Sequence, residues 1–246
     1  MVKKIIGIVF LLYILCNSLI AQNISLLPTS NGKIIKHEYY TLSFLKDYKQ
    51  SEWTFYLSTK SNLIERVQRN NQFKKDPLLN NKSANNGDYL KSGYDKGHLI
   101  PAGDMCFCLQ SMTESFYFTN ISPQNPSFNR GVWGSLEEQV RNWVNEKDSL
   151  YIIIGPIFLN VQGYIGQNKI AVPGFFYKII YSPKDKSMIG FVLPNKKNIS
   201  KNLSNYIYTI NYIEVLTKLD FFYNLPDSIE NNMEDKVNMN YWKFNK

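Results

Sequence analysis

The stretch that decides the fold, Tyr94 to Arg141, reads YDKGHLIPAGDMCFCLQSMTESFYFTNISPQNPSFNRGVWGSLEEQVR. It opens with an Asp-x-Gly-His turn that ends at His98, one of only two histidines in the chain. An imidazole has a reference pKa of about 6.5, so it is mostly neutral at pH 7 and can act as a general base. Gly97 permits close backbone approach or an unusual dihedral angle, and Asp95 can pin the turn by capping backbone amides.

An amphipathic helix is predicted to begin at Asn129. Apolar residues recur after it at four-residue steps, namely Val132, Leu136, Val140 and Val144. At about 100° per residue, Glu137 lies two turns beyond Asn129, and Arg141 lies one turn further. The three side chains can therefore face one cleft.

These residue types suit the hydrolysis of phosphodiesters. Magnesium gives up its waters reluctantly, so one neutral oxygen from Asn129, together with substrate phosphate, can hold it. Glu137 can orient the waters on the ion, and His98 can deprotonate an attacking water. The cations available to meet negative charge on the phosphate are Arg69, Lys96 and Arg141.

Each residue taken singly has a structural alternative. His98 alone would be a structural histidine, Asn129 alone a helix cap, and Glu137 alone a solvent-facing carboxylate. Their combination in this order favours a catalytic site. The nearby basic residues that we expect only to be solvated are Arg66, Lys74 and Lys75.

Residues 1–21 have the composition of an export signal. Lys3 and Lys4 form a positive region, and residues 5–16 are an apolar run too short for a comfortable membrane span. An uncleaved anchor is the alternative. We expect removal of this segment and export to the periplasm or out of the cell, without stable insertion in the membrane.

Residues 22–246 are long enough to form one domain with a large core. Loss of two lysines and no acidic residue with the signal lowers the net charge from +8 to +6. This basic balance indicates an acidic partner, either nucleic acid or anionic lipid, and charge alone does not separate the two.

The two cysteines after the signal, Cys106 and Cys108, are separated by one residue. On a strand such thiols lie too far apart for an unstrained bridge, so we favour free thiols over a disulfide. With only His37 and His98 besides, a structural zinc site has almost no ligands.

Apolar and aromatic runs predict the remaining elements. The predicted strands are His37–Leu45, Trp53–Leu57, Leu150–Phe158, Ile170–Tyr181 and Met188–Leu193. A short helix is expected over Ile210–Leu219, and the polar segment after Asp227 is expected to contribute little to the site.

From Arg69 to Arg141, and less tightly to about Pro226, the sequence resembles the DNA/RNA non-specific endonuclease family. These are the ββα-metal nucleases related to mitochondrial endonuclease G. The matching segments are RNNQFKKDP, YDKGHLIPAGDM, FYFTNISPQNPSFNRGVWGSLEEQ, IGPIF, VPGFFYKII and IEVLTKLDFF.

The resemblance implies an α+β fold, in which a central antiparallel β-sheet is flanked by helices and a ββα-metal finger presents His98 and Asn129. In the family the histidine activates water, and the asparagine is the sole direct protein ligand of a hydrated Mg²⁺, for which Mn²⁺ can substitute. By position, the water-orienting glutamate is Glu137. Arg69 and Arg141 match the family's phosphate-binding arginines, and we expect Lys96 and Asp95 to join them among the substrate-binding residues. Lys96 stands where the family often has arginine, which leaves phosphate affinity there open.

The implied function is that of an exported endonuclease that cuts DNA and RNA and leaves 5′-phosphate ends. Attack by an external water requires no 2′-hydroxyl, and contacts to phosphate and sugar read little sequence. One alternative is an inactive, exported nucleic-acid-binding protein of the same fold, and another is a phosphodiesterase acting on a lipid or small ester. The sequence leaves open whether the protein is a homodimer.

Overall fold

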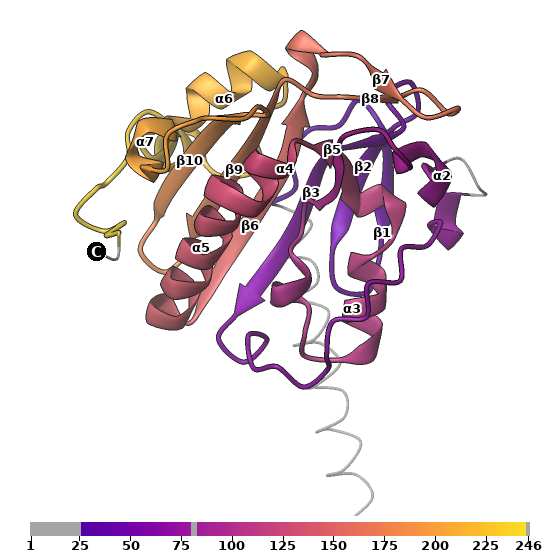
Figure 1. Ribbon diagram of the computed structural model, residues 1–246. Coiled ribbons are helices and arrows are strands. Elements are labelled where there is room, and N and C mark those ends of the chain that lie inside the picture. The colour runs from indigo at the N-terminus through magenta and orange to yellow at the C-terminus, as the bar shows by residue number, and fades with distance from the viewer. Residues whose placement is uncertain (1–25, 80–82, 245–246) are drawn as a thin grey trace, which may run out of the picture.

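The computed structural model describes residues 26–79 and 83–244 (Figure 1). The export signal expected over residues 1–21 lies outside the described residues. Within the described ranges, no helix combines the length and apolar character needed to cross a membrane.

A seven-stranded antiparallel sheet forms the centre of the molecule, in the order β1-β2-β3-β6-β9-β10-β11. Its strands are β1 (Lys33–Lys36), β2 (Thr41–Leu45), β3 (Gln50–Thr59), β6 (Ser149–Ile157), β9 (Phe175–Ser182), β10 (Ser187–Pro194) and β11 (Ile207–Tyr208). The four long strands are rich in aromatic and β-branched residues, which pack well on a pleated surface. The strands predicted around Trp53, Leu150 and Met188 are confirmed.

Two predicted strands differ from the structure. The first begins at Thr41 instead of His37, because the chain reverses there and the His37 amide donates to the Tyr40 carbonyl over 2.9 Å. The second is divided at Pro173 and Gly174, since proline lacks the amide donor that a ladder needs. The part before this break is β8 (Ile170–Ala171), which pairs with β7 (Tyr164–Ile165) in a small separate hairpin.

Helices cover both faces of the large sheet (Figure 1). Helix α5 (Gly134–Lys147) packs on one face, and α6 (Ile210–Thr217) and α7 (Asp227–Glu234) pack on the other. Buried side chains of α5 and its face of the sheet include Leu136, Val140, Trp143, Ile152, Phe176 and Ile180. The opposite face includes Trp53, Ile153, Tyr177 and Ile179, packed with Ile210, Ile213 and Met233. The expected α+β class with flanking helices is therefore confirmed.

A separate two-stranded ribbon is formed within the stretch from Tyr94 to Arg141. Strand β4 (Asp95–His98) pairs antiparallel with β5 (Ile121–Gln124), with His98 opposite Ile121. The chain then enters α4 (Pro126–Phe128), a π-helical turn (Asn129–Trp133) and α5. Of two short helices, α2 (Asn86–Tyr89) precedes β4 in the sequence, and α3 (Leu109–Ser115) lies in the connection between β4 and β5.

The helix predicted to start at Asn129 begins earlier. Asn125 caps α4 by accepting the Ser127 amide over 3.0 Å, and Pro126 occupies the first turn. Gly131, with φ −105° and ψ −114°, interrupts the helical geometry before α5. A constant turn of 100° per residue therefore does not run from Asn129 to Glu137.

One further prediction concerns the two cysteines. Cys106 and Cys108 are free thiols, as expected, and Cys108 caps α3 by accepting the Ser111 amide over 3.4 Å. The polar C-terminal segment still contributes to the core, because Trp242 is buried 5.0 Å from Trp143, measured between ring centroids.

Candidate active site

His98 is the last residue of strand β4, and aromatic side chains surround its ring. Its ring meets Phe116 edge-on at 4.7 Å and Phe73 at 5.5 Å between centroids. Nε2 is buried and has no hydrogen-bond partner among the described residues. Burial, together with the charge of Arg69, lowers the pKa of His98 to about 3. The imidazole is therefore neutral at physiological pH, the state that a general base requires.

Gly97 allows the two ribbon strands to come together. A Cβ built at this position would overlap the buried side chain of Gln124 on β5. The φ angle of Gly97 is not positive, so of the two reasons considered for this glycine, close approach is the one that applies. The position of His98 thus depends on the absence of a side chain beside it.

Asn120 fixes the chain immediately after His98. Its Oδ1 accepts the Ile100 amide over 2.9 Å, and its Nδ2 donates to the Ile100 carbonyl over 3.0 Å. Its own carbonyl accepts the Leu99 amide over 2.9 Å. Asn120 was not among the predicted site residues, although an amide in the apolar run FYFTNI was a signal for a buried hydrogen-bonding role.

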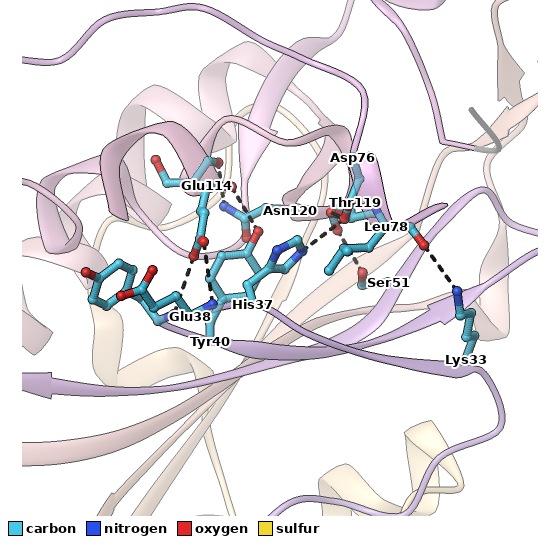
Figure 2. A network of polar contacts seen from close by, with 12 residues as sticks. Lys33, His37, Glu38, Tyr40, Ser51, Asp76, Leu78, Glu114, Thr119 and Asn120 are labelled. Atoms are coloured by element: carbon cyan, nitrogen blue, oxygen red, sulfur yellow. Dashed lines mark hydrogen bonds and ion pairs between the residues drawn. The ribbon is translucent and has the colours of Figure 1, made fainter. Parts of the chain in front are cut away.

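Figure 2 shows a network of polar contacts that includes Asn120 and the other histidine, His37. His37 Nε2 lies 3.0 Å from Asp76 Oδ2, and the same carboxylate oxygen accepts the Thr119 hydroxyl over 2.6 Å. Glu114 adds to the network by accepting the amide of Tyr39 over 3.4 Å. The second histidine of the chain therefore ties the β1–β2 turn to the residue before Asn120, and its role is structural.

Asn129 is held in one orientation by Asp95. Its Nδ2 donates to Asp95 Oδ2 over 2.9 Å, and Arg130 donates to both oxygens of that carboxylate, over 2.8 and 2.6 Å. Asn129 Oδ1 accepts no hydrogen bond from the described part of the chain. Asp95 was expected to cap backbone amides and to lie with the substrate-binding residues. The structure instead engages it with two side chains of the helical arm.

Glu137 lies on the first turn of α5, partly buried and among charged groups. Burial raises the pKa of Glu137 above its usual range, and the positive charge of Lys178 counteracts part of that rise. Lys178 is buried on β9 with its Nζ 4.6 Å from the Trp133 ring. We did not select Lys178 from the sequence, although a lysine inside the apolar run GFFYKII is unusual for a strand covered on both faces.

Arg141, one turn beyond Glu137, is clamped by a buried carboxylate. Its NH1 donates to Asp104 Oδ1 over 3.1 Å, and Tyr56 donates its hydroxyl to Asp104 Oδ2 over 2.6 Å. Asp104 is 2% exposed, whereas the Arg141 side chain is 31% exposed, so the carboxylate is buried and the guanidinium reaches solvent. The clamp sets the direction of the guanidinium beside Glu137.

The other two predicted cations flank His98. The guanidinium carbon of Arg69 lies 5.2 Å from the centre of the Phe116 ring, and Lys96 Nζ lies 4.2 Å from that of Phe73. Lys96 also donates to Asn86 Oδ1 over 2.9 Å. Both cations therefore rest on the aromatic rings that enclose the imidazole.

The donor set fits a hydrated cation better than a fully protein-ligated one. No cluster of three or more His, Cys, Asp or Glu side chains suited to a metal ion occurs in residues 26–79 and 83–244. Asn129 Oδ1 is oriented by Asp95 and accepts no hydrogen bond from the described residues, so a neutral amide oxygen is available to a cation. Magnesium tolerates one protein oxygen because it keeps most of its waters.

Comparisons with known proteins show the family to which the chain belongs. The family model for DNA/RNA non-specific endonuclease matches residues 22–228. Nuclease C1 of Cunninghamella echinulata var. echinulata is 32% identical, over 79% of this chain and 84% of its own. The mitochondrial nuclease EXOG of Mus musculus is 30% identical, over 82% of this chain and 60% of its own. Among solved structures, this chain is similar to a chain of the EndoG/EndoGI complex, a crystal structure described as showing the mechanism of EndoG inhibition. The TM-score is 0.74 at 30% sequence identity, and the match covers 79% of this chain and 87% of that chain.

The expected export to the periplasm or out of the cell is wrong on these comparisons. Mouse EXOG, nuclease 1 of Schizosaccharomyces pombe and the Saccharomyces cerevisiae relative are mitochondrial nucleases, and this chain spans 60%, 49% and 59% of their lengths. Two lysines before an apolar run are therefore not enough to predict the cellular compartment of the protein. The fold, the match over residues 22–228 and the relatives agree on one point: the chain belongs to the DNA/RNA non-specific endonuclease family.

Proposed function

We propose that the protein is a magnesium-dependent endonuclease that hydrolyses DNA and RNA without sequence preference. The observation that carries this proposal is the 2.9 Å hydrogen bond from Asn129 Nδ2 to Asp95. It crosses from the helical arm to the strand that ends at His98, and it leaves Asn129 Oδ1 available to a cation. This hydrogen bond holds the proposed base, His98, and the proposed metal ligand, Asn129, in one ββα unit.

In this mechanism His98 takes a proton from an attacking water, because its imidazole is neutral and has a free ring nitrogen. Arg141 and Arg69 stabilise the negative charge that develops on the phosphate oxygens. Asn129 would hold Mg²⁺, or Mn²⁺ in its place, and a bound ion would supply positive charge to the reacting phosphate. Glu137 would orient water at such an ion by accepting hydrogen bonds from it.

Two properties of the products and substrates follow. Departure of the 3′ oxygen leaves the phosphate on the 5′ end. The nucleophile comes from solvent, so a 2′-hydroxyl is not needed, and both DNA and RNA are substrates.

The test is nicking of a supercoiled plasmid, and cleavage of an RNA, by the purified protein with magnesium and with a chelator. His98→Ala and Asn129→Ala should each lose at least about a hundredfold in rate, as expected for a missing base or a missing charge-stabilising centre. Glu137→Gln should also be impaired. Glu138→Gln, at the exposed neighbouring position, is the matched control and should cut normally.

Metal-dependent cleavage lost in the first three variants and kept in the control would support the assignment. A wild type that binds nucleic acid but does not cut would favour the inactive binding protein. Full activity of His98→Ala would refute this catalytic site even if the protein is a nuclease.

A further inference from the structure

A short basic loop follows strand β10 beside the finger. It presents three exposed lysines within six residues, namely Lys196, Lys197 and Lys201. No carboxylate of the described chain forms an ion pair with them. Three uncompensated cations on one loop concentrate positive charge at a single place on the surface.

Asn195 anchors the start of this loop to the finger. It is 1% exposed, and its Nδ2 donates to the carbonyls of Pro123 and Pro173 over 3.0 and 2.9 Å. Its Oδ1 accepts the Asn125 amide over 2.7 Å. The Asn125 carbonyl in turn accepts the Asn129 amide over 2.8 Å. Two hydrogen bonds therefore connect the residue before the first lysine to the candidate metal ligand.

The far end of the loop is also fixed. Ile199 and Leu203 pack against the core cluster that includes the buried face of α5, so the loop lies on the same side of the sheet as the site. Tyr206 donates its hydroxyl to the Ser200 carbonyl over 2.9 Å, and Asn205 donates to the Ser200 hydroxyl over 3.0 Å. A loop held at both ends loses little conformational entropy on binding.

We propose that Lys196, Lys197 and Lys201 form a binding track for the backbone of a nucleic-acid strand that continues past the cleavage site, which rests on the proposed function. Lysine ammonium groups bind phosphates as point charges and carry no sequence information. Phosphates recur about every 3.4 Å of helix axis along each strand, so a substrate engaged at Asn129 has further phosphates within reach of the loop. The track would add affinity without base specificity.

The test compares two double variants that remove the same charge. Lys196→Ala/Lys197→Ala changes the loop, whereas Lys184→Ala/Lys186→Ala changes exposed lysines in the turn at the other end of β10. The eight residues of β10 separate these ends by about 26 Å. Binding of a labelled DNA duplex is measured over a range of salt, with His98→Ala in every protein so that binding occurs without cleavage.

We expect the loop pair to make the negative slope of log K against log salt shallower by about 1.8, since each lost phosphate contact removes about 0.9 from its magnitude. The control pair should leave the slope unchanged. Equal effects of the two pairs, or no effect of the loop pair, would overturn the track. If the parent protein fails to bind and the wild type fails to cut, the proposed function itself has failed.

Discussion

Arg141 is held by the buried carboxylate of Asp104, and the importance of this contact for activity can be tested by substitution. Asp104→Asn keeps the shape of the side chain but removes the carboxylate that accepts from Arg141 over 3.1 Å. A hydrogen bond to a charged group contributes about 1.5–3 kcal/mol, so kcat/KM for plasmid cleavage should fall about ten- to a hundredfold. The circular dichroism spectrum should not change.

Tyr56→Phe is the milder companion to this change, because it removes only the hydroxyl that donates to Asp104 over 2.6 Å. Its loss of kcat/KM should be smaller than that of Asp104→Asn. Wild-type kinetics in Asp104→Asn, in the presence of a large loss in Arg141→Ala, would show that the clamp does not position the guanidinium.

The protonation state of His98 can be checked directly, because the chain has only two histidines. Burial and the charge of Arg69 lower the pKa of His98 to about 3, so the ring binds no proton as the pH falls from 8 to 5. In an NMR titration its imidazole resonance, assigned by its loss in His98→Gln, should stay constant over this range. A midpoint near the reference value of about 6.5 would contradict the buried, neutral imidazole.

At the scale of single residues, the sequence could identify the groups with distinctive chemistry but not the groups that hold them. His98, Asn129 and Glu137 stand out by type and spacing. Asp104 and Lys178 belong to the same electrostatic cluster, yet they come from separate elements. Their roles arise from tertiary contacts between distant parts of the chain, which local patterns do not contain.

At the scale of elements, the β4–β5 ribbon depends on the contact between Gly97 and Gln124. In Gly97→Ala the new methyl group would overlap the buried Gln124 side chain and push the strands apart. Overpacking of this kind costs about 1–3 kcal/mol, so the midpoint of urea unfolding and the cleavage rate should both fall.

The double variant Gly97→Ala/Gln124→Ala supplies the control, since the shorter side chain makes room for the added methyl group. It should recover activity relative to Gly97→Ala, and Gln124→Ala alone shows the effect of losing the amide. If the double variant is no better than Gly97→Ala, steric overlap is not the reason for the glycine.

Element boundaries show where sequence patterns succeed and fail. Apolar runs located the central strands because strands covered on both faces need continuous apolar sequence. The predicted helix start at Asn129 is wrong because the apolar repeat from Val132 to Val144 reports only the buried face of the helix. It contains no sign of the backbone interruption at Gly131. The Asn125-Pro126 pair is a cap signal in its own right, and it marks the true start.

At the scale of the whole molecule, the net charge of +8 conceals an uneven distribution. The finger and the loop after β10 carry cations on the α5 side of the sheet. The helices on the opposite face bring together acidic groups, which are Glu214, Asp220, Glu230 and Glu234. Composition alone does not reveal that basic and acidic side chains gather on opposite faces of the sheet.

The acidic group also makes stability depend on pH. Burial, reinforced by the charges of Glu214, Glu230 and Asp220, raises the pKa of Glu234 to about 8, and Glu234 is 4% exposed. Between the ordinary glutamate value of about 4.3 and 8, the folded state holds a proton that the unfolded state has lost, so stability falls as the pH rises through this window.

Glu234→Gln is neutral at every pH and should remove this dependence. We expect it to raise the Tm above that of the wild type at pH 8.5, by about 2–4 °C for each kcal/mol recovered, and to converge with the wild type near pH 5. Asp235→Asn, at the exposed adjacent position, controls for the loss of one negative charge and should show no such convergence. Parallel Tm curves for Glu234→Gln and the wild type would mean that Glu234 is ionised in the folded protein.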